Sequence, residues 1–163
     1  MDPLLRRAAR LVVINPENNV LLFQYEDDGR KWWATPGGGL EGEETFEEAA
    51  AREAAEELSP TGGILVPLWC RTVEFTFRGQ WIRQVERYFL MRLSRLDFAP
   101  SETVREEHRR EGIVAARWWS LEELETAAER VFPEDLCECL RGLRLSDSLQ
   151  APLFFGPLAG TDG

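Results

Sequence analysis

The sequence predicts a single α/β domain in which helices pack against a β-sheet, and three observations support this. Apolar runs bounded by turn residues occupy residues 9–36 and 64–93, which is typical of β-strands. Residues 44–58 are rich in Ala, Glu and Arg, which are strong helix formers. The chain has 163 residues, of which 44% are hydrophobic. That size and composition suit one domain over residues 1–163 with its own core.

The first strands are expected to form a hairpin that leads into a third strand. Residues 9–15 (ARLVVIN) and 20–25 (VLLFQY) are the paired strands, and the Asn- and Pro-containing sequence between them is a turn. A second turn, EDDGR, precedes a short strand over residues 31–36 (KWWATP). This third strand runs directly into three glycines, after which the helix of residues 44–58 begins.

Three further strands are expected after this helix, at residues 64–72, 73–79 and 84–93. The last two should form a hairpin around residues 78–80, where Arg, Gly and Gln follow one another. The polar stretch over residues 97–112 is expected to be a loop or a short irregular helix. It is followed by one more strand, residues 113–120 (IVAARWWS).

Two helices are expected in the C-terminal part of the chain. Ser120 and Glu123 have the spacing of a capping box, which predicts a helix over residues 120–131. Pro133 suits the first turn of a last helix over residues 133–145, because proline is favoured where its missing N–H has no helical partner.

The two termini bear on location and assembly. The N-terminal sequence MDPLLRRAARLVV has no long apolar core and no cleavage site, so a signal peptide is not expected. No apolar run approaches the roughly 20 residues of a membrane helix. We therefore predict a soluble, cytoplasmic protein. The apolar tail, residues 146–163, packs either on the domain or on a partner subunit, which leaves a homodimer open.

Charge and cysteine content exclude several kinds of function. The formal net charge of −10 argues against non-specific binding to nucleic acid or to an anionic membrane, since both require a basic face. An acidic protein can still bind a polyanion through divalent cations. Cys70, Cys137 and Cys139 form no regular framework and predict reduced thiols in an intracellular protein. A single histidine, His108, argues against a histidine metal site or a Ser-His-Asp triad.

The helix of residues 44–58 carries three carboxylates on one edge. At 100° per residue, Glu53, Glu56 and Glu57 fall within an arc of about 100°. Small apolar residues occupy the neighbouring face, so the helix should dock on the sheet with its acidic edge at the margin. A hard cation with oxygen ligands, Mg²⁺ or Mn²⁺, would remove the repulsion between these carboxylates. A solvated Glu-rich helix explains the same spacing, and the spacing alone favours it.

The loop before the helix changes this balance. Residues 37–39 are three consecutive glycines between a strand and a helix. Glycine lets the backbone approach a ligand closely, and a helix N-terminus offers free N–H groups to phosphate oxygens. A tight strand-to-helix turn explains one or two glycines, but less easily three. Together, the loop and the acidic edge predict a metal site that binds a phosphate-containing ligand.

This stretch resembles the Nudix box, G-x5-E-x7-R-E-U-x-E-E-x-G-U, in which U is a bulky aliphatic residue. The box covers residues 38–60, and its fixed glycine and polar positions fall on Gly38, Glu44, Arg52, Glu53, Glu56 and Glu57. Ala54 stands at the first U, and Ser59 and Pro60 replace the closing pair. The resemblance implies a Nudix fold, an α/β/α sandwich in which a mixed β-sheet lies between helices.

The resemblance also implies a role for most of these residues. Glu53, Glu56 and Glu57 would hold the metal, with Glu57 as the central ligand. The carbonyl group of Gly37, just before the box, would be a further ligand. Arg52 would pair with carboxylates on the helix and orient them.

Other implied contacts lie outside this acidic edge. Glu44 would brace the loop or assist metal binding. Many members of the family use another glutamate from a later loop as base or metal ligand. Glu106, Glu107 and Glu111 are candidates here, and we predict Glu107 for this catalytic role.

Substrate contacts are harder to place than the metal ligands. We expect them from Gly38 and Gly39 in the loop, and from Trp33 and Tyr25 on the preceding strands. The two aromatic rings could stack on a base. Trp32 and Phe23 on the same strands could also stack, and packing in the core is the default explanation for at least two of these four aromatic residues.

Members of the Nudix family hydrolyse a nucleoside diphosphate linked to a further group X, with Mg²⁺ or Mn²⁺. The resemblance therefore implies a pyrophosphohydrolase for a nucleoside triphosphate or a related small nucleotide. The proline of ADP-ribose hydrolases, expected near Phe75, and the tyrosine of dinucleoside polyphosphate hydrolases, expected near Phe77, are absent. The alternatives are a Nudix-fold nucleotide-binding or regulatory module without turnover, and related chemistry on a non-nucleotide diphosphate.

Overall fold

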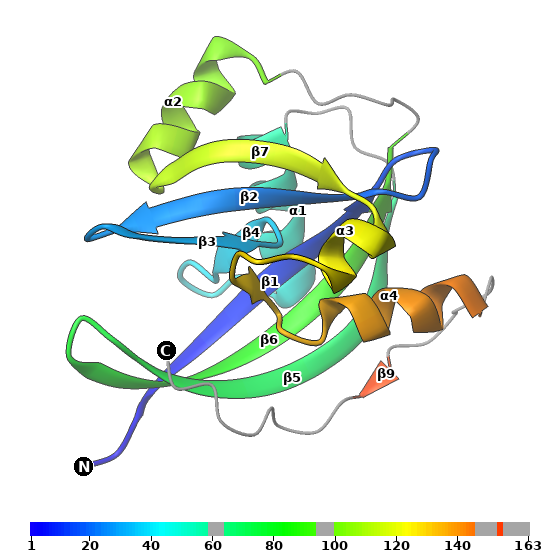
Figure 1. Ribbon diagram of the computed structural model, residues 1–163. Coiled ribbons are helices and arrows are strands. Elements are labelled where there is room, and N and C mark those ends of the chain that lie inside the picture. Colours follow the sequence, from blue (N-terminus) through cyan, green and yellow to red (C-terminus); the bar gives the residue numbers. More distant parts are fainter. Residues whose placement is uncertain (59–63, 94–99, 146–152, 155–163) are drawn as a thin grey trace.

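The structure is a computed structural model that describes residues 1–58, 64–93, 100–145 and, for the backbone, 153–154. The strands are β1 Leu4–Ile14, β2 Val20–Asp27, β3 Arg30–Ala34, β4 Gly37–Gly39, β5 Leu65–Phe77, β6 Gln80–Arg92, β7 Ile113–Trp119, β8 Val131–Phe132 and β9 Leu153–Phe154. The helices are α1 Phe46–Leu58, α2 Glu102–Arg110, α3 Leu121–Glu125 and α4 Leu136–Leu145. Within the described residues, the nine strands form one curled sheet with helices on both faces (Figure 1).

The sheet is mixed. Its strands follow the order β8-β3-β2-β1-β6-β5-β9, while β4 pairs with β1 and β7 pairs with β2. β1 runs parallel to β6 along its whole length, whereas β2, β4 and β7 form antiparallel pairs. The predicted α/β/α sandwich around a mixed sheet is therefore confirmed.

Each face of the sheet carries its own hydrophobic core. On one face, α1 packs Ala49, Ala50 and Leu58 against inward residues of β1, and α2 lies beside α1. On the other face, Leu136 and Leu140 of α4 pack into the second core, and α3 lies beside α4. The two alanines of α1 are fully buried, so small residues allow this helix to lie close to the sheet as predicted.

The first part of the chain differs from the prediction at three points. Strand β1 begins at Leu4 rather than at residue 9, because its first residues pair with β6 from Ile82 onward. The three glycines are not a free loop but form the short strand β4, which pairs with β1. Strands β2 and β3 agree with the predicted bounds to within two residues at each end, and they pair antiparallel. The predicted pairing of residues 9–15 with 20–25 is wrong over most of its length: it is limited to Ile14 and Val20, because β1 pairs with β6, and β2 pairs with β3 and β7.

The prediction of two separate strands over residues 64–72 and 73–79 is wrong. They form one strand, β5, which pairs with β6 throughout. A register shift between Pro67 and Cys70 absorbs the irregular spacing of apolar residues without ending the strand. The predicted hairpin is present: Arg78 and Gly79 both have positive φ, which matches a two-residue turn between twisted strands.

The C-terminal helices also differ in extent. Residues 102–110 form a regular helix, α2, whose first turn is capped by the Ser101 hydroxyl. The capping box at Ser120 is confirmed, but α3 ends after Glu125, and β8 follows. Pro133 precedes the last helix instead of lying in its first turn. The carbonyl oxygen of Pro133 accepts a hydrogen bond from the N–H of Leu136, which closes a turn, and α4 begins at Leu136.

Further predictions concern the cysteines, membrane-spanning helices and the C-terminal tail. Cys139 is buried and Cys137 half-buried on α4, and no cysteine of the described residues forms a disulfide. None of the helices in the described ranges has both the length and the apolar character needed to cross a bilayer. Ser59, Pro60 and most of the tail lie outside the described residues, so the predicted helix stop and the homodimer stay predictions.

Candidate active site

Strand β4 brings its glycines against the middle of β1. Gly37 pairs with Arg10, and Gly38 pairs with Ala9. Gly37 has a φ of +141°, and a Cβ there would lie 2.1 Å from the carbonyl oxygen of Ala9. A Cβ on Gly38 would lie 2.5 Å from Oε1 of Glu53. Gly37 is therefore required by the close approach of β4 to β1, and a side chain at Gly38 would displace the Glu53 carboxylate, before any ligand is considered.

Helix α1 presents Glu53, Glu56 and Glu57, together called the acidic edge, toward this strand. Glu53 and Glu57 are 7% and 2% exposed, whereas the Glu56 side chain is 38% exposed. The backbone N–H of Gly37 donates to Oε2 of Glu57 at 3.1 Å. Two of the three carboxyl groups thus lie in the protein interior, which excludes a solvated helix face as their explanation.

Arg52 is the cation of the acidic edge. Its Nη1 donates to Glu53 at 2.9 Å and to Glu56 at 3.2 Å. Its Nε and Nη2 donate to the two carboxylate oxygens of Glu44, at 2.8 and 3.0 Å. Nη2 also donates to the carbonyl oxygen of Gly39 at 3.0 Å. Arg52 thus joins the helix to the glycine strand, and these are the contacts that an orienting role requires.

The carboxyl groups around Arg52 have opposite pKa shifts. Hydrogen bonds from Arg52 lower the pKa of Glu44. Burial raises the pKa of Glu57 well above its usual range, and the charge of Glu53 and a hydrogen bond between the two carboxyl groups raise it further. Burial and the charge of Glu53 also raise the pKa of Glu56. The acidic edge therefore carries more negative charge than Arg52 balances.

The donors at this site suit a hard cation, because all of them are oxygen atoms. Burial and the neighbouring charge of Glu53 raise the pKa of Glu57, which favours its protonated form, and a cation bound by the same oxygens would replace that proton. Within the described ranges, no three acidic, histidine or cysteine side chains converge as a ready metal cluster. Arg52 contacts one oxygen of Glu53 and one oxygen of Glu56, so it does not occupy the second oxygen of either carboxyl group.

Helix α2 brings further carboxyl groups toward the acidic edge. The charge of Glu107 contributes to the raised pKa of Glu56. Partial burial raises the pKa of the largely exposed Glu111, and the charges of Glu53 and Glu107 raise it further. Glu106 is exposed on the same helix. The structure therefore brings Glu107 and Glu111 near the acidic edge, and their catalytic roles stay predictions.

His108 was not singled out as part of the site, yet it fixes the position of α2. The imidazole Nε2 lies 2.9 Å from the carbonyl oxygen of Glu57, at the end of α1. Its ring packs against Phe23, with centroids 4.7 Å apart. Burial lowers the pKa of His108. The spacing of Val104 and His108, four residues apart in a charged stretch, was the available sequence signal for a buried helix face.

The two aromatic residues expected at the substrate lie in different environments. Trp33 is 6% exposed and packs edge-on against Trp119, so it is a core residue. Its neighbour Trp32 lines a cavity instead, because adjacent strand residues face opposite sides. Tyr25 stacks on Trp32, and its buried hydroxyl has no hydrogen-bond partner among the described residues. Burial and then the charge of Glu57 raise the pKa of Tyr25, so this hydroxyl lies near the acidic edge.

A cavity of about 350 Å³ adjoins the glycine strand, and we call it the Arg10 cavity. Its apolar walls are formed by Trp32, Val73, Phe75, Phe77, Phe132 and Pro133. Its exposed basic residues are Arg6, Arg30, Lys31 and Arg130. A flat apolar group that carries negative charge matches this combination of aromatic walls and basic rim.

The Arg10 cavity also contains a buried polar group centred on Glu86. The Glu86 carboxylate accepts hydrogen bonds from Nε of Arg10 at 3.2 Å, Nε2 of Gln84 at 3.0 Å and the hydroxyl of Tyr88 at 3.4 Å. These residues were not predicted as site residues. Their signal was the alternation of Ile82, Gln84, Glu86 and Tyr88, which places polar side chains on the inward face of β6.

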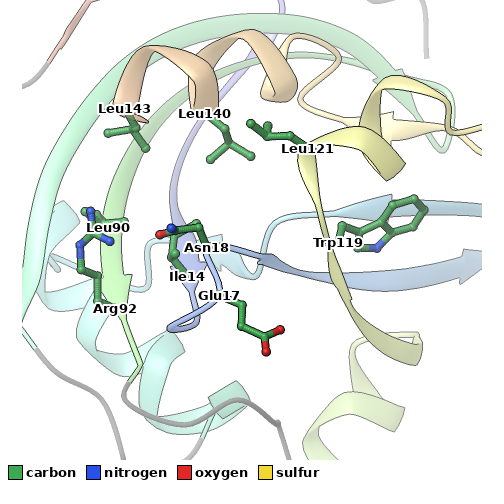
Figure 2. Close-up of a pocket in the computed structure, with 9 residues that line it drawn as sticks. All are labelled: Ile14, Glu17, Asn18, Leu90, Arg92, Trp119, Leu121, Leu140 and Leu143. Atoms are coloured by element: carbon green, nitrogen blue, oxygen red, sulfur yellow. The ribbon is translucent and has the colours of Figure 1, made fainter. Parts of the chain in front are cut away.

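A larger cavity, of about 510 Å³, lies away from these residues (Figure 2). Leu121, Leu140 and Leu143 of the C-terminal helices face Ile14 across it. Glu17 is its one acidic lining residue in the described part of the chain. This cavity contains none of the predicted site residues.

The fold and the acidic edge together define a Nudix-type domain, and sequence comparison agrees. A sequence model of the NUDIX domain matches residues 4–136. The chain belongs to the Nudix family. A curated relative, the RNA pyrophosphohydrolase of Pelagibacter ubique (strain HTCC1062), is 29% identical over 97 residues, or 54% of this chain and 61% of the relative. The matched region thus spans less than two thirds of that relative.

Solved structures share the fold. The NUDIX hydrolase from Nitrosomonas europaea has a TM-score of 0.63 at 21% identity, over 97% of this chain and 80% of that chain. The MutT protein from Methanosarcina mazei Go1 has a TM-score of 0.62 at 19% identity, over 91% of this chain and 99% of that chain. Both comparisons support the α/β/α architecture.

Proposed function

We propose that this protein is a pyrophosphohydrolase that cleaves a diphosphate linkage in a nucleoside diphosphate-X compound, with Mg²⁺ or Mn²⁺ as cofactor. The substrate is a nucleoside triphosphate or a related small nucleotide. The observation that carries this proposal is the buried, hydrogen-bonded carboxyl pair of Glu53 and Glu57 beside Gly37, next to a basic and aromatic cavity. Membership of the Nudix family and the name of the Pelagibacter relative support the same chemistry.

The proposed mechanism divides the work between the acidic edge and the cavity. Glu53, Glu56 and Glu57 would hold the cation, with the carbonyl group of Gly37 as a further ligand. A bound divalent cation neutralises diphosphate charge and makes a water molecule more acidic. Arg52 orients Glu53 and Glu56 through its hydrogen bonds.

The remaining steps use the other carboxyl groups and the cavity. Glu107 would accept the proton of the water that attacks phosphorus, and Glu111 is the alternative base on the same side of the acidic edge. The aromatic walls of the Arg10 cavity, including Trp32 and Phe132, would hold the nucleoside ring. The attacked phosphorus–oxygen bond then breaks, and a phosphate fragment leaves.

A substrate panel tests the proposal. The purified chain is incubated with nucleoside triphosphates, nucleotide sugars, dinucleotides and RNA with a 5′-triphosphate, in Mg²⁺, Mn²⁺ or a chelator. We expect phosphate or pyrophosphate release that requires the cation. Reaction in ¹⁸O-labelled water, followed by mass spectrometry, identifies the phosphorus that is attacked.

Two outcomes would contradict the proposal. Turnover that is unaffected by chelator would remove the metal from the mechanism. No turnover with any compound, together with tight nucleotide binding in titration calorimetry, would identify a binding module without catalysis.

A further inference from the structure

Arg10 occupies the point where the Arg10 cavity meets the glycine strand. It lies opposite Gly37 of β4 on one side of β1 and opposite Tyr88 of β6 on the other. Its Nη1 lies 3.5 Å from the carbonyl oxygens of both Thr35 and Gly37. The side chain also lines the cavity. One guanidinium group therefore reaches both the glycine strand and the cavity.

Glu86 determines where this guanidinium points. It accepts the Arg10 Nε–H at 3.2 Å, and its own side chain is only 9% exposed. Gln84 and Tyr88 also donate to Glu86, so the carboxylate that orients Arg10 is itself fixed. The contacts of Arg10 with Thr35 and Gly37 are longer, so the ion pair with Glu86 is the stronger constraint.

Part of the guanidinium remains available to a ligand. Arg10 uses Nε and Nη1 for its protein contacts, and Nη2 has no hydrogen-bond partner within the described residues. The Arg10 side chain is 23% exposed and opens to the cavity. The other basic residues of the cavity, such as Arg6 and Arg30, are exposed and bind an anion with greater loss of side-chain freedom.

We propose that Arg10 binds a phosphate group of the substrate where the cavity meets the glycine strand, and that Glu86 positions its guanidinium for this contact. This inference rests on the proposed function, because the acidic edge would hold the adjoining phosphate through the cation. Arg10 is thus the protein's own positive charge at the diphosphate. It neutralises charge that develops when the linkage breaks.

Replacement of Arg10 tests the contact directly. We expect Arg10→Ala to lower kcat/KM by about 100-fold, the usual cost of losing one preorganised donor to a developing charge. Arg10→Lys should restore only part of this loss, because an ammonium group cannot donate in the same planar geometry. Added guanidinium ion should partly restore the activity of Arg10→Ala. Arg83→Ala is the matched control, because Arg83 lies on the opposite face of β6 and pairs with Glu74.

Glu86→Gln tests the positioning role separately. It keeps a side chain of the same shape but removes the charge that holds Arg10. We expect kcat/KM to fall about 10-fold, since misplaced contact groups cost up to about 100-fold. Added guanidinium ion should not restore this variant, because its own arginine still occupies the site.

Binding of an unreactive substrate analogue separates this inference from the proposed function. Titration calorimetry with a methylene-bridged nucleoside diphosphate and Mg²⁺ should show weaker binding to Arg10→Ala than to the wild type. That result would support the phosphate contact even if the wild type hydrolyses nothing. Equal binding and equal turnover of Arg10→Ala and wild type would overturn it. So would a loss of activity that guanidinium ion does not restore and that accompanies a lower unfolding temperature, because Arg10 would then be structural.

Discussion

The acidic edge and the polar group of the Arg10 cavity lie on two sides of the same glycine strand, and their charges are arranged in opposite ways. At the acidic edge, Glu53 and Glu57 are both buried, and burial and the charge of Glu53 raise the pKa of Glu57. In the cavity, the single carboxylate of Glu86 receives hydrogen bonds from three donors.

This difference separates a site that needs a ligand from a site that is already complete. A buried carboxylate with three donors is satisfied without any addition. Two neighbouring buried carboxyl groups repel each other when both are ionised, and the donors from Arg52 and Gly37 offset only part of that repulsion. We therefore expect changes at the acidic edge to affect catalysis and metal binding, and changes in the cavity to affect substrate affinity.

The largest effect should come from Glu57→Gln. The carboxamide keeps the shape of the side chain but removes its charge, so we expect kcat to fall by about 1,000-fold in a rate assay with the best substrate of the panel. Glu47→Gln is the matched control, because Glu47 is exposed on the first turn of the same helix. Rates like those of the wild type in Glu57→Gln would refute the assignment of the metal site.

A smaller loss is expected from Glu107→Gln. Removal of a general base costs at least about 100-fold in kcat, and a rate assay with the best substrate of the panel measures this loss. Glu106→Gln, next to it on the exposed side of α2, should leave kcat unchanged. If the loss instead occurs in Glu111→Gln, then Glu111 is the base and the prediction for Glu107 is wrong.

Truncation of a cavity wall should change affinity rather than rate. Phe132→Ala removes an aromatic face of the Arg10 cavity, and we expect KM to rise about 10-fold with kcat almost unchanged. Leu143→Ala removes a wall of the larger cavity in Figure 2 and is the matched control. A larger rise in KM for Leu143→Ala would place the substrate in the larger cavity.

The smallest effect concerns stability without metal. The folded state raises the pKa of Glu57 above its usual value near 4.5, so between these two values the folded state binds more protons than the unfolded state. The free energy of unfolding should therefore fall as pH rises through this window. Thermal unfolding in chelator should show a lower Tm at higher pH, and Mg²⁺ should reverse the decrease. Glu57→Gln should show a smaller slope, and equal slopes in both proteins would contradict the explanation.

The acidic edge was accessible from the sequence because its geometry is local. Helical spacing alone places Glu53 and Glu57 on one edge, and the neighbouring alanines predict how the helix docks. The sequence predicted that the glycines bind a ligand. In the structure, a side chain at Gly37 would clash with the backbone of β1, and one at Gly38 would meet the Glu53 side chain of α1. Those contacts come from chain segments that are distant in sequence.

The Arg10 cavity was not predicted because it depends on such distant pairings. Arg10 and Glu86 are 76 positions apart, and only the parallel pairing of β1 and β6 brings them together. The prediction of Trp33, rather than its neighbour Trp32, as a substrate contact was limited in a similar way. Trp32 and Trp33 have the same chemistry, and only the register of β3 decides that Trp33 enters the core while Trp32 faces the cavity.

Gly37 has a consequence that reaches beyond packing. Its N–H donates to Glu57 of the acidic edge, and its carbonyl oxygen accepts from Arg10 of the Arg10 cavity. The two peptide groups on either side of this Cα thus contact two different sites. A backbone rotation at Gly37 that turned its carbonyl oxygen toward a cation would also change its hydrogen bonds with Glu57 and Arg10. Binding of a metal by the Gly37 carbonyl oxygen would therefore also change the position of Arg10 in the Arg10 cavity.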